Sequence, residues 1–138
     1  MLERTPGASL KDFAIHISVV DLDTGNSLKP PTMIRSSSSG VAEGSHILKR
    51  NGYYYLFTAE GGTEGGHSEW VCRSTEGPLG PWEVGPQNPL WRNTMNDELQ
   101  NTGHADLVED KHGNWWAVSL GVRPTRKWGK WETSVFGQ

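Results

Sequence analysis

Short runs of β-branched and aromatic residues, in which apolar and polar positions tend to alternate, recur along the chain. No run has the spacing of apolar residues that an amphipathic helix needs. Runs of this kind, separated by turn sequences, predict β-strands. The predicted strands are residues 14–20, 31–35, 45–49, 53–59, 69–73, 81–84, 105–109 and 115–120. The pattern therefore predicts an all-β fold.

The strongest hairpin signal is Asn51-Gly52, which lies between the predicted strands 45–49 and 53–59. Asn-Gly favours a two-residue turn because both positions accept a positive φ. The second of these runs is apolar on both faces, so we expect that strand to be buried on both sides.

A second hairpin signal, residues 105–120, has the same order of features as the first. In each, a Gly and a His lead into a strand, which is followed by a Gly-containing turn and an aromatic-rich strand. The two histidines, His46 and His104, are separated by somewhat more than the roughly 50 residues of a kelch-type propeller blade. The order predicts propeller blades with long loops, and coincidence between two ordinary hairpins is the alternative. A partial ring leaves sheet edges unpaired, so we expect this chain to be a fragment.

Composition narrows the class of protein. The 138 residues are enough for one domain with a single core. A formal net charge of -3 is too small to indicate nucleic acid or an anionic membrane as a partner. One cysteine, Cys72, excludes an internal disulfide and a cysteine-only zinc site, and we expect it to be a small buried strand residue. The first residues lack the apolar core of a signal peptide, and no stretch approaches a membrane span.

The 17 glycines and 7 tryptophans suit short strands joined by tight turns. A tryptophan can fill a core or form a platform for a sugar ring. Since tryptophan is buried to a large extent in most proteins, a core position is the more common of the two.

Two segments carry candidate chemistry near the first hairpin. Glu43 lies between a Ser- and Gly-rich loop and a predicted strand. A carboxyl group that enters a core from a loop is a candidate general acid, although a solvated glutamate is the more common situation. Residues 60–67 are rich in glycine but lack the Gly-Lys-Ser/Thr ending of a phosphate-binding loop. We interpret them as backbone that can approach a ligand closely.

Three further polar residues are candidates: the histidine of the second Gly-His sequence, His104, and two residues that come after it. His104 and Asp106 are two positions apart in a predicted strand, so their side chains share one face. They could be half of a metal site or part of a polar centre, and two ligands specify no particular metal. Arg123 follows the predicted strand 115–120 and could hold a substrate hydroxyl or orient a carboxylate. An exposed loop arginine is the alternative.

Taken in order, these segments resemble glycoside hydrolase family 43. Residues 43–59, EGSHILKRNGYYYLFTA, are similar to the family's general-acid segment, which has Glu-Gly-Pro-His, a short strand, a turn and a Tyr-rich strand. The motifs that follow in the family's order are EGGT at 60–63, His67, Arg73-Ser74, GPWE at 80–83, QNTGHADLV at 100–108 and LGVRP at 120–124. The resemblance implies part of a five-bladed β-propeller, with roughly two and a half blades in this chain.

The resemblance also implies roles for single residues. Glu43 matches the general acid. His104 matches a histidine near the propeller axis that in some members binds a calcium ion or an ordered water. Arg123 matches an arginine that contacts the sugar in the catalytic subsite. The remaining residues that it implies in substrate binding are Glu60, His67 and His46.

Two catalytic residues of the family have no match. The general base is an Asp of the first blade, usually in an Asp-Pro sequence, and a second Asp tunes and orients the acid. This chain contains no Asp-Pro. We expect both residues to lie upstream of this stretch, and the last blade to be unfinished at Gln138. In the complete enzyme the resemblance implies inversion, in which an acid protonates the leaving oxygen and a carboxylate about 6.5–9.5 Å away activates water.

The function implied by the resemblance is that of a β-xylosidase or α-L-arabinofuranosidase acting on xylan- or arabinan-type bonds. Residues 13–138 would be a partial catalytic domain, with residues 1–12 unassigned. The alternatives are a non-catalytic remnant and a carbohydrate-binding propeller fragment. The implied partner is a xylo- or arabino-oligosaccharide, the implied location is extracellular, and no cofactor is required apart from an optional calcium ion. Open propeller edges suggest self-association.

Overall fold

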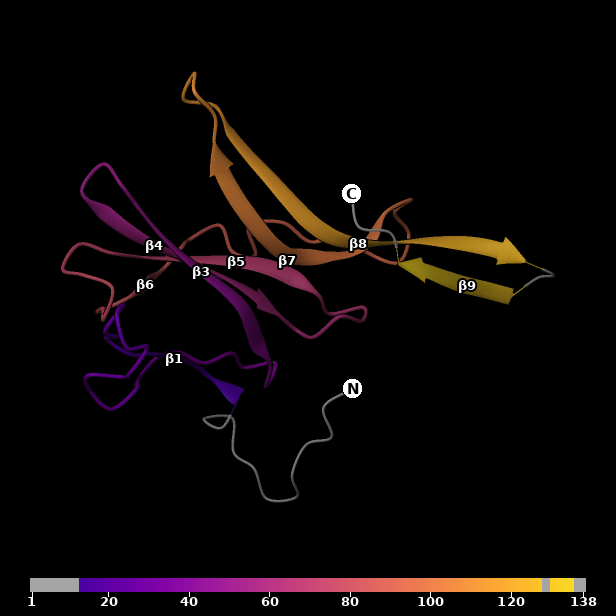
Figure 1. The fold of residues 1–138 in the computed structure, drawn as a ribbon. Helices are drawn as coiled ribbons and strands as arrows, with labels where there is room; N and C mark the ends of the chain where they lie inside the picture. Colours follow the sequence, from indigo (N-terminus) through magenta and orange to yellow (C-terminus); the bar gives the residue numbers. More distant parts are fainter. Residues whose placement is uncertain (1–12, 128–129, 136–138) are drawn as a thin grey trace.

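The computed structural model describes residues 13–127 and 130–135, in which β-strands are joined by turns and loops (Figure 1). The unassigned residues 1–12 lie outside this range, as do 128–129 and the end of the chain at 136–138. The described residues form a two-stranded, a four-stranded and a three-stranded sheet, all antiparallel. The strands are β1 (Ile15–Ile17), β2 (Thr32–Arg35), β3 (Ala42–Arg50), β4 (Tyr53–Glu60), β5 (Ser68–Ser74), β6 (Glu83–Val84), β7 (Gln100–Glu109), β8 (Trp115–Lys127) and β9 (Lys130–Val135). The all-β prediction is confirmed.

The four-stranded sheet follows the chain in the order β3-β4-β5-β6, which is how a propeller blade is built. The next sheet, β7-β8-β9, begins in the same way, with a long strand and a tight hairpin. The predicted repeat of two hairpins therefore corresponds to the first two strands of two successive sheets. In Figure 1 the tip of the β7–β8 hairpin points up and away from the four-stranded sheet.

The predicted Asn-Gly hairpin is confirmed. Asn51 has a φ of 50° and Gly52 a φ of 81°, the left-handed values that a two-residue hairpin turn needs. The following strand, β4, is buried on both faces as expected, since the neighbouring Leu56 and Phe57 are 0% and 8% exposed. Cys72, on the adjacent β5, is buried as well. The core of the described residues therefore lies around β4 and β5.

The second hairpin is longer than the apolar pattern predicted. Its second strand, β8, continues to Lys127 and pairs with β9, a strand that the pattern did not predict. Pro124 lies beyond Val122, the last β8 residue that pairs with β7. At that point β8 has one partner only, and proline is tolerated at such an edge. The expectation that Arg123 follows the end of a strand is therefore wrong, because Arg123 lies inside β8.

The first strand of this hairpin, β7, is irregular. Its register against β8 shifts twice, between Gln100 and Gly103 and between Gly103 and Asp106. Two non-glycine residues adopt left-handed backbone there, Asn101 with a φ of 52° and His104 with a φ of 57°. The strand begins at Gln100, five residues before the start of the predicted strand 105–109. These irregularities lie where β7 packs against β3, β4 and β5.

The loop between β4 and β5 closes on itself at its base. Gly61 has a φ of 88°, and a side chain at this position would collide with the carbonyl oxygen of Gly66. Residues 63–65, at the tip of this loop, are exposed. The two glycines thus allow the ends of the loop to touch while its tip faces solvent.

One face of the β7–β8 hairpin carries exposed apolar side chains. Val108, Trp116 and Val118 are 61%, 60% and 54% exposed. Val108 and Trp116 are opposite each other in the ladder, and Val118 lies two positions further along β8 on the same face. This apolar face has no covering element among the described residues.

No helix in the described part of the chain has the length and apolar character needed to cross a bilayer.

Candidate active site

Glu43 is the second residue of β3 and pairs with Ala59 of β4. Its side chain is half-buried. The register of the two strands shifts between Glu43 and His46, and Gly44 adopts a left-handed φ of 53°. A bulge of this kind re-aims the side chains beside it, and bulges are common next to active sites.

The ring of His104 lies against Gly44. A methyl group at Gly44 would come within 2.6 Å of His104 Nε2 and 2.8 Å of His104 Cγ, so the glycine leaves the space that the ring needs. Gly44 belongs to β3 of the four-stranded sheet and His104 to β7 of the next sheet. The contact therefore brings His104 next to the residue that follows Glu43.

A second contact joins the same two strands. His46 Nδ1 lies 3.5 Å from Asp106 Oδ1, and the two side chains are 42% and 67% exposed. An exposed pair of this kind contributes little to stability. The pair does show how the strands are arranged, because the contacts Gly44–His104 and His46–Asp106 place β3 and β7 side by side. The sequence pattern placed His104 and Asp106 on one face, and both side chains are exposed while Ala105 between them is buried.

Glu60, predicted at the edge of a substrate pocket, is a buried residue at the end of β4. It is 3% exposed, and its Oε1 lies 2.6 Å from Arg35 Nη2 and 2.7 Å from Arg35 Nε. The hydroxyl of Thr58 donates a further hydrogen bond of 3.1 Å to the same oxygen. The guanidinium of Arg35 also lies over the ring of Trp70, 5.3 Å from its centroid. The carboxylate of Glu60 is thus fully engaged within the protein.

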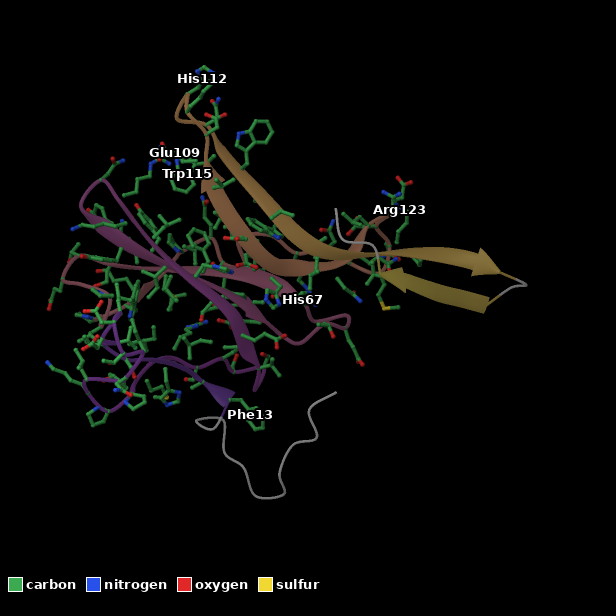
Figure 2. All side chains as sticks on the ribbon, viewed as in Figure 1. Phe13, His67, Glu109, His112, Trp115 and Arg123 are labelled. Atoms are coloured by element: carbon green, nitrogen blue, oxygen red, sulfur yellow. The ribbon has the colours of Figure 1, made fainter. Side chains whose placement is uncertain are left out.

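His67 is also buried, with 1% of its surface exposed. Figure 2 shows it in the middle of the molecule, where β5 and β7 pass each other. Its Nδ1 lies 2.8 Å from the carbonyl oxygen of Asn101, so Nδ1–H is the donor of this hydrogen bond. The other ring nitrogen, Nε2, is buried without a hydrogen-bond partner among the described residues and lies beside Gly103.

Glu69 is a site residue that sequence reasoning missed. It is 0% exposed, and its Oε2 accepts a hydrogen bond of 3.0 Å from the backbone N–H of Ala105. Burial raises the pKa of Glu69 to about 7, against the opposing effect of backbone hydrogen bonds from Ala105 and His104. The only sign in the sequence was a glutamate inside the strand run SEWVC, which is ordinary on the solvent-facing side of a strand.

Arg123 is separate from these contacts. It lies in β8, pairs with Ser134 of β9 and has an exposed side chain. In Figure 2 it lies well to the right of His67, toward β9. The structure therefore places His104 against Gly44, the residue after Glu43, and His46 beside Asp106, and it leaves Arg123 at a distance from His67.

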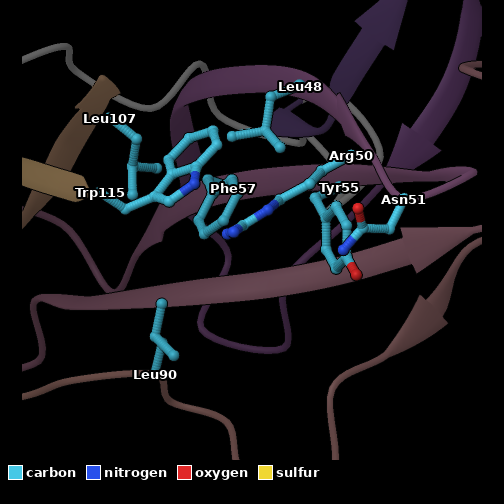
Figure 3. A pocket seen from close by; sticks show the side chains of 8 residues that line it. All are labelled: Leu48, Arg50, Asn51, Tyr55, Phe57, Leu90, Leu107 and Trp115. Atoms are coloured by element: carbon cyan, nitrogen blue, oxygen red, sulfur yellow. The ribbon is translucent and has the colours of Figure 1, made fainter. Parts of the chain in front are cut away.

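Two hollows lie near these residues. One, of about 480 Å³, lies between the loop that follows β4 and the beginning of the β7–β8 ladder. It is lined by Thr63, Glu64, His67, Asn101, Leu120, Gly121 and Val122. The other, of about 370 Å³, lies between the two larger sheets (Figure 3) and is mainly apolar. There the guanidinium of Arg50 lies over Trp115, 4.9 Å from the ring centroid. Glu43 and His104 line neither hollow.

Residues 13–127 and 130–135 contain no group of three or more His, Cys, Asp or Glu side chains that could hold a metal ion. Calcium takes six to eight oxygen ligands, whereas His104 offers one ring nitrogen. The described residues around His104 do not by themselves fit a calcium ion, and a calcium role for His104 stays a prediction.

Comparison with known proteins points to one family. The sequence model of Glycosyl hydrolases family 43 matches residues 7–136. The non-reducing end α-L-arabinofuranosidase BoGH43B of Bacteroides ovatus is 42% identical over 120 residues, which are 84% of this chain and 22% of that protein.

Solved structures give the same result. The crystal structure of the GH43 BlXynB protein from Bacillus licheniformis superposes with a TM-score of 0.77 and 35% identity, over 88% of this chain and 25% of that one. A xylan β-1,4-xylosidase from Bacillus halodurans has a TM-score of 0.77 and 34% identity, over 89% and 24%. This chain thus spans about a quarter of the length of the proteins it matches. The expectation of part of a five-bladed propeller, roughly two and a half blades, is confirmed, with β3–β6 as one complete blade.

Proposed function

The chain belongs to family 43 of the glycosyl hydrolases, and from this premise we propose that it provides the general-acid side of an active site that releases arabinofuranose or xylose units. The observation that carries the proposal is the contact of His104 with Gly44, the residue after Glu43. This contact places the imidazole of one blade against the backbone next to the candidate acid of the neighbouring blade. The names of the relatives, an α-L-arabinofuranosidase and a xylan β-1,4-xylosidase, support the class of sugar.

In this proposal Glu43 donates its proton to the glycosidic oxygen as the bond to the anomeric carbon breaks. A carboxylate on the opposite face of the sugar, about 6.5–9.5 Å from the acid, accepts a proton from the attacking water. Glu60 and Glu69 are fully buried, and Asp106 lies beside His46. We therefore assign the base to none of these three, and propose that it comes from another part of a complete propeller.

The other predicted residues have different parts in the proposal. His46 and Arg123 remain candidates for contact with the substrate, since their side chains are partly or largely exposed. Glu60 and His67 are too deeply buried to touch a sugar directly. We propose that the ion pair of Glu60 with Arg35 fixes the end of β4, from which the loop 61–66 starts. An extracellular polymer as the substrate source, and so an extracellular location, is part of the same proposal.

The second candidate function is binding of a carbohydrate without catalysis. It is favoured because Glu43 is the one carboxyl group of this chain that matches a catalytic residue of the family, whereas the general base has no match. In that case xylo- or arabino-oligosaccharides bind with a measurable heat in calorimetry and are recovered uncleaved. Self-association is a separate proposal, supported by the exposed apolar face of Val108, Trp116 and Val118.

The acid role can be tested in the absence of a base. Azide attacks an anomeric carbon without needing deprotonation, so it replaces the activated water. Cleavage of phenyl β-xyloside and phenyl α-L-arabinofuranoside with added azide then depends on the acid alone. We expect Glu43→Gln to lower azide-dependent phenol release by about 10²–10⁴-fold, the usual contribution of such a group. The matched control is Glu76→Gln, an exposed glutamate in the turn after β5.

Equal phenol release by the parent chain and Glu43→Gln would contradict the acid role. Release without azide that still depends on Glu43 would instead show that a carboxylate of this chain, or of a second copy, activates water. No release under any condition, together with calorimetric binding, would support the carbohydrate-binding function.

A further inference from the structure

Two buried polar side chains on β5 and the turn before it face the irregular part of β7. His67 directly precedes β5 and Glu69 is the second residue of that strand, and both side chains form hydrogen bonds with β7. They are 1% and 0% exposed. His67 Nδ1–H donates to the carbonyl oxygen of Asn101 at 2.8 Å, and Glu69 Oε2 accepts from the N–H of Ala105 at 3.0 Å. Each side chain thus holds one backbone group of β7.

The two backbone groups lie on either side of a distorted segment. The β7–β8 register shifts on both sides of Gly103, so the ladder with β8 is interrupted where these groups lie. Left-handed backbone costs about 1–2 kcal/mol for a non-glycine residue, and Asn101 and His104 both adopt it. Strained conformations of this kind persist only where the surrounding structure enforces them. The hydrogen bonds from His67 and Glu69 supply that enforcement.

The geometry also leaves no space for the segment to shift. A methyl group at Gly103 would lie 2.8 Å from His67 Nε2, so the backbone of β7 rests directly on the imidazole. One residue further on, the left-handed His104 turns its ring onto Gly44. The direction of the His104 ring is therefore set by the two anchored points that flank it.

We propose that His67 and Glu69 are positioning residues that hold His104 against Gly44, beside the general acid Glu43; the catalytic meaning of this inference rests on the proposed function. Neither touches the substrate. They act through the backbone of β7, and their effect on Glu43 passes through the contact between His104 and Gly44.

The unpartnered atoms of the pair support a role beyond packing. His67 Nε2 and Glu69 Oε1 are buried without a hydrogen-bond partner among the described residues. Each such group costs about 1–3 kcal/mol, which an apolar side chain of similar size would avoid. Burial also raises the pKa of Glu69 to about 7, a further cost of a carboxyl group at this position. The hydrogen bonds to β7 are what an apolar residue could not provide.

The position of His104 can be read by NMR, because an aromatic ring changes the chemical shifts of protons that lie beside it. The α-protons of Gly44 therefore report directly on the contact with His104. Two matched pairs of variants of the chain test the proposal. Glu69→Gln and His67→Asn keep an acceptor or a donor near the original atom, whereas Glu69→Leu and His67→Leu remove it. Cys72→Ala, a buried change on the same strand without contact to β7 in the hydrogen-bond network, controls for lost stability.

We expect Glu69→Gln, His67→Asn and Cys72→Ala to keep the ring-current shift of Gly44, and both leucine variants to lose it. A folded leucine variant with an unchanged Gly44 shift would overturn the proposal, as would loss of the shift in Cys72→Ala. If neither leucine variant folds, loss of the shift in Glu69→Gln or His67→Asn would overturn it, and its retention in both would support it. The NMR readout needs no catalysis. The positioning proposal can therefore be supported or overturned even if the glycosidase assay shows no activity.

Discussion

His104 and Gly44 interlock two blades of the propeller, with a hypothetical methyl group at Gly44 only 2.6 Å from His104 Nε2. The glycine is required twice, by this close approach and by its left-handed φ of 53°. Because Gly44 follows Glu43 directly, the same contact fixes the distance between the proposed acid and the neighbouring blade. Any change at this point should therefore alter stability and the surroundings of the acid together.

Comparison of Gly44→Ala with Gly52→Ala separates the cost of the left-handed φ from the cost of the close contact with His104. Gly52 has a φ of 81° and nothing within 4 Å of an added methyl group, so its substitution reports backbone strain alone, about 1–2 kcal/mol. We expect Gly44→Ala to lower the free energy of unfolding by clearly more, because the ring of His104 must also move. Urea denaturation of both variants measures the difference. Equal losses would show that His104 accommodates the methyl group without cost.

The buried carboxyl of Glu69 makes stability depend on pH. Its pKa is raised by burial from 4.5 to about 7, so the folded state holds its proton more tightly than the unfolded state does. The stabilisation is complete below pH 4.5 and is lost as the pH rises through 7. We expect the free energy of unfolding to fall by about 3 kcal/mol over this interval. Glu69→Gln, measured at the same pH values, should lack this part of the decline, and an identical decline would exclude Glu69 as its source.

Two arginine–glutamate ion pairs, Arg35–Glu60 and Arg73–Glu83, should differ in how much each stabilises the fold. Arg35→Met leaves the carboxylate of Glu60 buried without its cation, and loss of one partner of a buried pair costs about 3–5 kcal/mol. Arg73→Met breaks the pair with Glu83, whose side chains are 53% and 70% exposed, and should change stability little. Thermal or denaturant unfolding distinguishes them. A small effect of Arg35→Met would mean that Glu60 takes up a proton or reaches solvent.

The exposed apolar face of the β7–β8 hairpin leads to a prediction about self-association. Trp116 is the largest side chain on that face and is 60% exposed. We expect the chain to associate in a concentration-dependent way and Trp116→Ser to weaken that association. Val84→Ser, which removes a 50% exposed apolar side chain from β6, is the control. Light scattering that shows a strict monomer for the parent chain at all concentrations would contradict the prediction.

The strands could be predicted because their signals are local. The first hairpin could be predicted from two strand-like runs on either side of Asn51-Gly52. The structure has the turn at these two residues, with β3 and β4 paired on either side of it. The extension of β8 past Pro124 could not be predicted in this way. A proline lowers the expectation of a strand, and only the pairing of Pro124 with Thr133 of β9 shows that the strand continues through it.

The site residues also differ in this respect: some have a signal in the local sequence, and others depend on contacts between distant segments. Glu43 and His104 were found through an ordered set of motifs, and their proximity depends on a contact between two sheets that no local pattern contains. Glu60 was expected at a pocket edge, and the partner that buries it, Arg35, is 25 positions away along the chain. Glu69 was missed because a lone glutamate in a strand is unremarkable until the strand is known to be enclosed.

The contact between Gly61 and Gly66 has a consequence for which positions of the loop tolerate substitution. The two glycines touch at the base of the loop, and the segment between them is held by residues outside it: the carbonyl oxygen of Thr63 accepts a hydrogen bond from Asn101 Nδ2, and that of Gly65 accepts one from Arg92 Nη2. Thr63 and Glu64, which line the larger hollow, can be exchanged for other residues while the base of the loop keeps its shape. A substitution at Thr63 or Glu64 would therefore change the lining of this hollow, while the hydrogen bonds that hold the loop remain available because backbone carbonyl groups make them.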